Sequence, residues 1–183
     1  LGVAVAMNKV SSGATATMLS GGASAGGLML VAALAQAALT ATVALDAFTA
    51  AAANGVVGTA DAKGYGFAIA LNDVRADAAA SVVGVGVVVG SLTVRAQAVP
   101  LLTAQTDVAM ETSTAGGSVL NSGGSETVAG VVATNLVQGG ADASIVGGSV
   151  LTSVGDVIVE SDVAGSISAG VINAVEGGSK GVA

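Results

Sequence analysis

The sequence predicts an all-β chain folded as a parallel β-helix, or β-solenoid. Three observations predict this fold: a long internal repeat, a composition of small and β-branched apolar residues, and short apolar segments separated by glycine. The chain has 183 residues, of which 52% are hydrophobic but only 2% aromatic and 9% charged. Ordinary domains carry about 25% charged residues. This composition therefore favours flat, repetitive packing over a globular core.

The internal repeat brings Asn8 onto Asn72. Residues 2–16 read GVAVAMNKVSSGATA, and residues 66–80 read GFAIALNDVRADAAA. Identical residues also recur at this shift for Gly26, Leu28 and Ala32. A third, more divergent copy begins at Val131. Self-similarity at a long fixed period is typical of stacked repeat folds.

We therefore expect one solenoid segment over residues 1–183, with repeat units at about 1–64, 65–129 and 130–183. Each unit is a super-repeat of about 64 residues that holds about three coils of roughly 20 residues, as in known β-solenoids. The first residues already belong to a repeat and do not show a signal-peptide pattern. The segment is accordingly expected to belong to a longer or polymeric rod.

Twelve apolar segments are the expected strands, each near the usual length of about 5–6 residues. In chain order they are 3–7, 14–19, 28–32, 39–45, 66–71, 81–89, 92–96, 103–110, 126–134, 143–148, 156–161 and 165–172. Many alternate with a period of two; in 156–162, Val157, Val159 and Ser161 face one way and the acidic residues the other.

Glycine-rich breaks between these segments supply the positive φ angles that sharp corners need. They lie at 20–27, 52–55, 116–117, 121–124, 138–140, 146–148 and 176–178. The only proline, Pro100, also falls between two segments. Strands this frequent leave no room for crossover helices.

A helical alternative remains open for residues 30–53, where alanine is densest. The uncharged stretch 28–45 is also long enough for a transmembrane helix of about 20 residues. Its repeat partner from Ser91 onward contains Arg95, Pro100 and Asp107, which a membrane span tolerates poorly. Aligned copies should share a fold, so the non-membrane interpretation is preferred.

Composition also excludes several function classes. The chain has no Cys and no His, so it has no Ser-His-Asp triad, no Cys-His pair and no thiolate or imidazole metal site. The net charge is −7, and no basic residue lies between Arg95 and Lys180. A nucleic-acid partner needs a basic face. We expect neither an enzyme nor a nucleic-acid-binding protein.

Two groups of polar residues are candidate sites. Asn8, Asn72 and Asn135 recur at the end of an apolar segment. A ligand-binding row is one interpretation, but we prefer structural corner residues, whose amides bond to the backbone of the next coil or which adopt left-handed backbone geometry. Asp156, Glu160 and Asp162 share one outward face and are weak candidates for Ca²⁺ ligands; a solvated acidic face is the alternative. Otherwise we expect no cofactor.

Three Thr-x-Thr strings suggest a binding role of another kind. They are Thr15–Thr17, Thr40–Thr42 and Thr112–Thr114. Stacked threonine ranks on a flat solenoid face could order water and bind ice. An ice-binding or Ca²⁺-dependent glycan-binding module is therefore the alternative function.

The repeat pattern resembles a known bacterial family. The first element of the pattern is VAVAMN from Val3 and FAIALN from Phe67. The second element follows each of them, as LMLVA from Leu28 and LTVRA from Leu92 respectively, and occurs again as GDVIVES from Gly155. This is similar to the repeats of filamentous-haemagglutinin-like and leukotoxin-like large exoprotein adhesins. The resemblance implies a right-handed parallel β-helix, secretion to the cell surface or medium, and a role in adhesion or as a stalk.

The outward faces carry few charges, because the whole chain has only 5 Lys and Arg and 12 Asp and Glu. Exposed apolar area on this scale usually marks a contact surface, and open coil ends add unpaired backbone edges. We therefore expect a structural segment of a secreted bacterial adhesin or extracellular filament. Its partners would be further copies packed end to end or laterally, adjoining coils of a parent protein, or a host or matrix surface.

Overall fold

The computed structural model describes residues 1–52, 60–116, 123–152 and 154–181, and this part of the chain contains β-strands and no helix. The strands are β1 (Gly2–Ala52), β2 (Ala60–Gly116), β3 (Gly123–Thr152), β4 (Val157–Val163) and β5 (Ser166–Gly181). All pairings are parallel: β2 lies between β1 on one side and β3, β4 and β5 on the other. The prediction of an all-β chain with parallel strands is confirmed.

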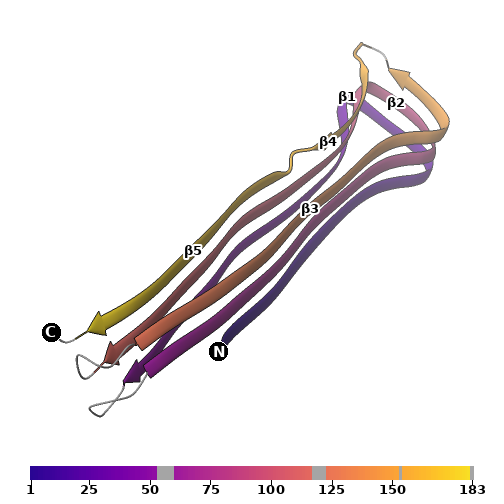
Figure 1. Cartoon of the computed structure of the whole chain (residues 1–183). Coiled ribbons are helices and arrows are strands. Elements are labelled where there is room, and N and C mark those ends of the chain that lie inside the picture. The colour runs from indigo at the N-terminus through magenta and orange to yellow at the C-terminus, as the bar shows by residue number, and fades with distance from the viewer. Residues whose placement is uncertain (53–59, 117–122, 153, 182–183) are drawn as a thin grey trace.

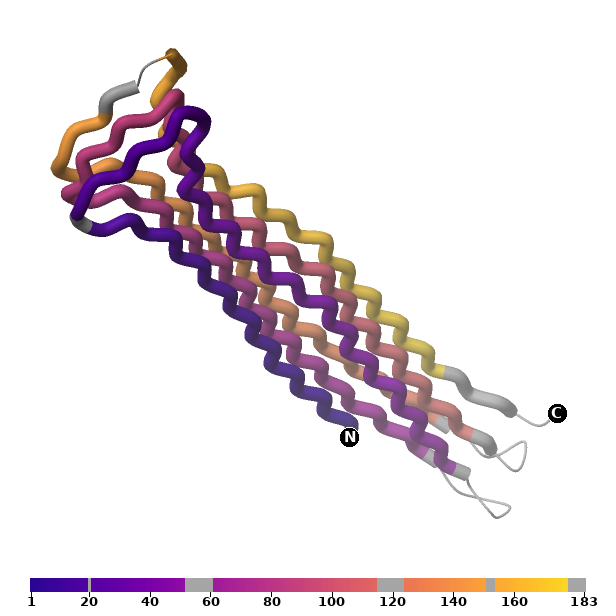
Figure 2. The backbone as a smooth tube through the Cα atoms, turned by 180° about the vertical axis from the view of Figure 1, so that it is seen from behind, coloured from indigo at the N-terminus to yellow at the C-terminus, as the bar shows by residue number. Residues whose placement is uncertain are grey.

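The strands form three layers, each bent back on itself (Figures 1 and 2). The first layer is β1, the second is β2, and the third is β3, β4 and β5 together. In every layer one arm runs to the bend and another returns beside it. The first arm comprises 2–19, 66–83 and 129–146; the second arm comprises 28–52, 91–115, β4 and β5. The bends gather at one end, and β1 begins and β5 ends at the other.

One complete coil of the chain contains many more residues than predicted. Gly2 pairs with Gly66, Tyr65 with Val128, and Leu102 with Ile167, so a strand meets its neighbour only after one whole repeat. The prediction that each repeat holds about three short coils is therefore wrong, because the repeat itself is the spacing between layers. The twelve short strands are likewise joined into longer ones, of which β2 has 57 residues.

The pairing follows the sequence repeat in the first arm but departs from it in the second. A bulge between Ala25 and Leu28 shortens the shift between β1 and β2 by one position. Leu28 therefore pairs with Ser91, not with the identical Leu92. A one-residue slip moves a side chain to the opposite face of a strand. Accordingly Leu28 is exposed whereas Leu92 is buried.

The core lies between the two arms. Even-numbered residues of β2 point inward along both arms and are almost all buried, among them Val74, Val82, Leu92 and Val94. Gly66 of the first arm lies against Met110 of the second, and a side chain at Gly66 would overlap the Met110 sulfur. Small inward residues thus let the arms approach closely, as the Ala- and Val-rich composition indicated.

Glycines with positive φ mark the bend. Gly21 has φ 132°, Gly84 64°, Gly147 59° and Gly148 114°. Such angles are costly for residues with a Cβ atom. Two of the predicted breaks, 20–27 and 146–148, coincide with this bend. By contrast, 138–140 and 176–178 lie inside β3 and β5, and the breaks at 52–55, 116–117 and 121–124 fall partly outside the described residues.

Pro100 explains why the third layer is broken into β4 and β5. The carbonyl of Ala98 accepts the amide of Ala164 at 2.9 Å, so even-numbered residues of β2 turn their backbone groups toward the third layer here. Pro100 has no N–H to continue this ladder. The chain passes it at Gly165, between the end of β4 and the start of β5, where a Cβ atom would lie 3.3 Å from the proline ring.

The helical alternatives are not observed. Residues 30–52 are part of β1, so the local helix is wrong there, and Ala53 lies outside the described residues. In the described ranges there is no helix of sufficient length and apolarity to cross a membrane. The alternating pattern of this part of β1 places Val31, Ala33 and Ala35 inward and Leu34 outward, which explains the strand.

Candidate functional site

The three repeated asparagines form a ladder through the layers. The Nδ2 of Asn8 donates to the Oδ1 of Asn72 at 2.9 Å, and the Nδ2 of Asn72 donates to the Oδ1 of Asn135 at 2.8 Å. They stand at matching positions of β1, β2 and β3. Their prediction as corner residues is wrong, because all three lie well inside strands and bond side chain to side chain.

Asn72 occupies the middle of this ladder and is only 3% exposed. It is the only buried asparagine in the described core, and both its donor and its acceptor are used. A buried amide must be hydrogen-bonded to be tolerated. The ladder therefore stabilises the register in which asparagine pairs with asparagine, and a slip by one residue would lose these hydrogen bonds.

A shallow groove of about 350 Å³ runs across the outer face beside the ladder. Its floor and walls are the outward columns Met7, Leu71 and Thr134 on one side and Lys9, Asp73 and Leu136 on the other. The lining is largely apolar, and Met7 is 74% exposed. This groove holds no paired carboxylates or other reactive constellation among the residues that line it.

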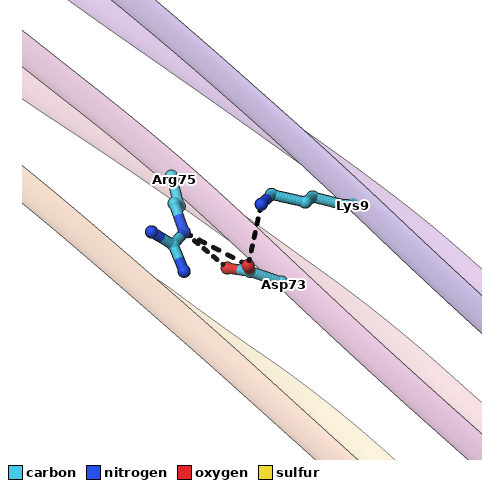
Figure 3. A network of polar contacts seen from close by, with 3 residues as sticks. All are labelled: Lys9, Asp73 and Arg75. Atoms are coloured by element: carbon cyan, nitrogen blue, oxygen red, sulfur yellow. Dashed lines mark hydrogen bonds and ion pairs between the residues drawn. The ribbon is translucent and has the colours of Figure 1, made fainter.

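Charged side chains beside the groove join two layers (Figure 3). The Nε of Arg75 donates to both carboxylate oxygens of Asp73 at 3.1 Å, and the Nζ of Lys9 lies 3.9 Å from the same carboxylate. The hydrogen bond to Asp73, and then its negative charge, raise the pKa of Arg75. All these groups are at least partly exposed, so water screens the pairs and each contributes little to stability.

Two further ion pairs also join adjacent layers. Lys63 Nζ lies 3.4 Å from Glu126, and Arg95 Nε lies 3.5 Å from Glu160. The Arg95 contact is a loose electrostatic one, because its buried Nε makes no hydrogen bond. Sequence reasoning did not identify these pairs, since opposite charges so far apart along the chain become neighbours only once the register is known.

The acidic candidates for Ca²⁺ do not converge. Glu160 faces Arg95, Asp162 accepts a hydrogen bond from Gln97 at 3.1 Å, and Asp156 contributes its backbone carbonyl to Leu92 at 3.0 Å. Within residues 1–52, 60–116, 123–152 and 154–181, no three acidic side chains gather as a metal site. The strand alternation expected for 156–162 is nevertheless confirmed, because Val157 and Val159 pair with the buried Leu92 and Val94.

The Thr-x-Thr strings do not form one rank. Thr15 and Thr17 point outward from the first arm, whereas Thr40 and Thr42 point outward from the second. The Thr112–Thr114 string faces inward, and the Thr112 hydroxyl lies 2.5 Å from that of Thr127 in the opposite arm. The threonines are thus divided among two outer faces and the interior.

Exposed apolar side chains lie on both arms, and those of the first arm include a group on its outer face near the open end. The members of this group include Leu1, Val3, Val5, Met7, Phe67, Val128, Val132 and Leu136. They come from all three layers, and Met7 and Leu136 among them line the groove. Contiguous apolar surface of this kind is typical of a contact face.

The two sides of the layer stack are also open. β1 pairs only with β2, and β3, β4 and β5 each pair only with β2. Each outermost layer therefore presents backbone N–H and C=O groups along its free edge, which can template another strand.

No protein-family model matches this chain, and no curated protein or solved structure matches it either.

Proposed function

We propose that the chain is a structural β-solenoid segment of a secreted bacterial adhesin or extracellular filament, which self-associates through its apolar faces and open edges. One observation carries the proposal: a parallel stack three layers thick has a free edge on each side. Natural proteins normally cover, shorten or charge such edges. Here the edge strand β1 is 51 residues long and carries only two charged side chains, Lys9 and Asp46.

The resemblance to large exoprotein adhesins supports secretion and a right-handed sense of the coil. The apolar outer face of the first arm supports contact with further copies, with adjoining coils of a longer protein, or with a host or matrix surface. The polar side chains support a structural role, since the ladder and the ion pairs join layer to layer.

Electron microscopy of the purified chain, combined with X-ray diffraction from aligned material, tests the proposal. We expect fibres with a reflection at about 4.8 Å along the fibre axis, the spacing of stacked strands. A monodisperse monomer that persists at high concentration would overturn self-association. Fractionation of the producing cells tests the location: retention of the whole chain inside the cells would contradict secretion.

A further inference from the structure

The two free edges of the stack are different surfaces. One edge is formed by β1 alone, and the other by β3 in the first arm and by β4 and β5 in the second. Because every pairing is parallel, the two edges run in the same direction. The third-layer edge of one copy can therefore accept β1 of another without any reversal of the chain.

Part of each inward row matches across such a junction. Extending the register by one layer places seven apolar inward residues of β1 on identical third-layer residues, whereas others meet a different residue, such as Ala4 on Val131, Ala35 on Val163 and Leu45 on Asn173. The matching pairs are Ala6 on Ala133, Val10 on Val137, Ala14 on Ala141, Ala16 on Ala143, Val31 on Val159, Ala41 on Ala169 and Val43 on Val171. At these seven positions the junction would continue the existing core without a change in side-chain volume.

The asparagine ladder gives the junction a polarity. Every amide donates in one direction, from β1 to β2 to β3. The Oδ1 of Asn8 accepts no hydrogen bond from any described residue, and the Nδ2 of Asn135 donates none to them. One edge thus offers an acceptor and the other a donor at the same height along the first arm.

We propose that copies of this chain stack head to tail, so that β1 of each copy lies on β3, β4 and β5 of the copy before it. Asn135 of the earlier copy then donates to Asn8 of the later one. This inference rests on the proposed function and specifies its partner and register. The edge strand β1 has 51 residues. At about 3.3 Å per residue this edge runs for roughly 170 Å. A contact strip about 5 Å wide along it already reaches the roughly 800 Å² per partner of a stable interface.

This contact joins two unlike surfaces, so it does not close on itself as a two-fold dimer does. Repeating it adds one three-layer copy after another along a single axis, which produces an open, polar filament. The apolar outer face of the first arm would then become a continuous stripe along the filament and is not needed for its growth.

Cysteine cross-linking tests the register, because the chain contains no cysteine of its own. Ser11 and Gln138 point outward two layers apart in one copy, as do Thr17 and Ser144. Two layers are about 9.6 Å, beyond the reach of roughly 7 Å between the Cα atoms of a disulfide. Across the proposed junction, Ser11 of one copy lies directly beside Gln138 of the next.

Single variants should be mixed in all four combinations. We expect oxidation to give disulfide-linked dimers when Ser11→Cys meets Gln138→Cys and when Thr17→Cys meets Ser144→Cys. The crossed pairs, Ser11→Cys with Ser144→Cys and Thr17→Cys with Gln138→Cys, are displaced by about 20 Å along the strand and should give no disulfide-linked dimers. Equal yields in matched and crossed pairs, or dimers of Ser11→Cys alone, would overturn the inference.

A second variant tests the ladder. Asn135→Asp keeps the oxygen that accepts from Asn72 but replaces the free donor with a carboxylate facing Asn8 of the next copy. We expect the fold to persist by circular dichroism and the critical concentration for assembly to rise at least tenfold. Thr134→Asp adds the same charge one residue away, on the outward face, and should have a smaller effect. If Asn135→Asp assembles like the parent chain, the proposed amide junction is wrong.

These outcomes separate the inference from the function on which it rests. Fibres that form without matched cross-links, or that form equally well with Asn135→Asp, would leave the filament proposal standing and remove the head-to-tail register. A chain that never assembles would remove both.

Discussion

Asn8 and Asn72 are 64 residues apart in sequence, yet the amide of one donates to the other at 2.9 Å. The bond continues to Asn135 in the third layer. The repeat is therefore a spatial period, in which one unit of sequence makes one layer of the stack. Because each amide satisfies its neighbour, these residues stabilise the aligned register more than any slipped one.

Replacing Asn72 with alanine should destabilise the chain strongly. The substitution leaves the donor of Asn8 and the acceptor of Asn135 without partners in a partly buried row. A buried group that loses its hydrogen bond costs roughly 1–3 kcal/mol. Urea unfolding followed by circular dichroism measures the change.

Asn8→Ala is the matched control for Asn72→Ala. Asn8 stands at the free edge, so its replacement breaks one hydrogen bond and leaves one group, the Oδ1 of Asn72, without its partner, whereas Asn72→Ala breaks two bonds and leaves two such groups. A single hydrogen bond contributes about 1 kcal/mol to stability. We expect the Asn72 variant to unfold at a clearly lower urea concentration. Equal midpoints for the two variants would show that the ladder does not act as a unit.

The sequence predicted the parallel all-β fold because the repeat, the small residues and the two-residue alternation all indicate it. It did not predict the layer length. Glycine pairs were interpreted as corners, but glycine is equally compatible with extended backbone. Gly139 and Gly140 accordingly lie inside β3, whereas the glycines with positive φ, including Gly84, lie at the bend. The local pattern around a glycine does not distinguish one that bends the chain from one that continues a strand.

For a related reason, the sequence identified the three asparagines but indicated the wrong role for them. The recurrence of Asn8, Asn72 and Asn135 was visible, but a corner and a mid-strand ladder leave the same spacing in sequence. Likewise Glu160 could be placed on an outward face, but Arg95 becomes its neighbour only through the register of β4 on β2. The shift in this register is one position longer than the sequence repeat, because the bend contains unequal numbers of residues in different layers.

Gly84 at the bend should tolerate asparagine better than alanine. Its φ is 64°, and a Cβ atom there would meet no other atom within 4 Å, so any cost comes from the backbone alone. Left-handed backbone costs an alanine roughly 1–2 kcal/mol, and asparagine adopts it more readily. We expect the order of stability Gly84, then Gly84→Asn, then Gly84→Ala in chemical unfolding.

Gly13 provides the contrast for Gly84. It lies in the first arm of β1 with no positive φ, and a Cβ atom would approach only the Asp77 carbonyl, at 3.9 Å. Gly13→Ala should therefore stabilise by about 0.4–1 kcal/mol through the unfolded chain. A destabilising Gly13→Ala would contradict the extended backbone assigned to this position.

The Lys63–Glu126 pair should make stability depend on alkaline pH. The hydrogen bond with the Glu126 side chain, followed by its charge, raises the pKa of Lys63 above the ordinary 10.5. A raised pKa in the folded state means that the stabilisation is fully present below the ordinary pKa and is lost as the pH rises through the folded value. Because the lysine is exposed, the effect is small.

Thermal unfolding of Glu126→Gln from mildly to strongly alkaline pH measures this effect. The variant should unfold at a slightly lower temperature than the parent chain at mildly alkaline pH, and the difference should vanish at the strongly alkaline end. Glu111→Gln is the control, because Glu111 pairs with Glu176 and its replacement removes a like-charge contact. It should unfold at the same or a higher temperature than the parent chain at mildly alkaline pH.

The valine row Val31, Val94 and Val159 offers the last prediction, since the same residue stands in all three layers. Val94 is fully buried and Val159 is 49% exposed. Removing two buried methyl groups costs roughly 2–3 kcal/mol, so Val94→Ala should lower the unfolding free energy by about that amount. For the monomer, Val159→Ala should cost less than about 1 kcal/mol.

Assembly should change this order. In a head-to-tail stack, Val159 is covered by Val31 of the next copy and acquires the environment that Val94 has within one chain. Val159→Ala should then weaken the filament almost as much as Val94→Ala weakens the monomer, which a dilution-induced disassembly assay measures. If Val159→Ala left disassembly unchanged, the third-layer edge would not be the contact between copies, because a valine enclosed on both sides cannot lose its methyl groups without cost.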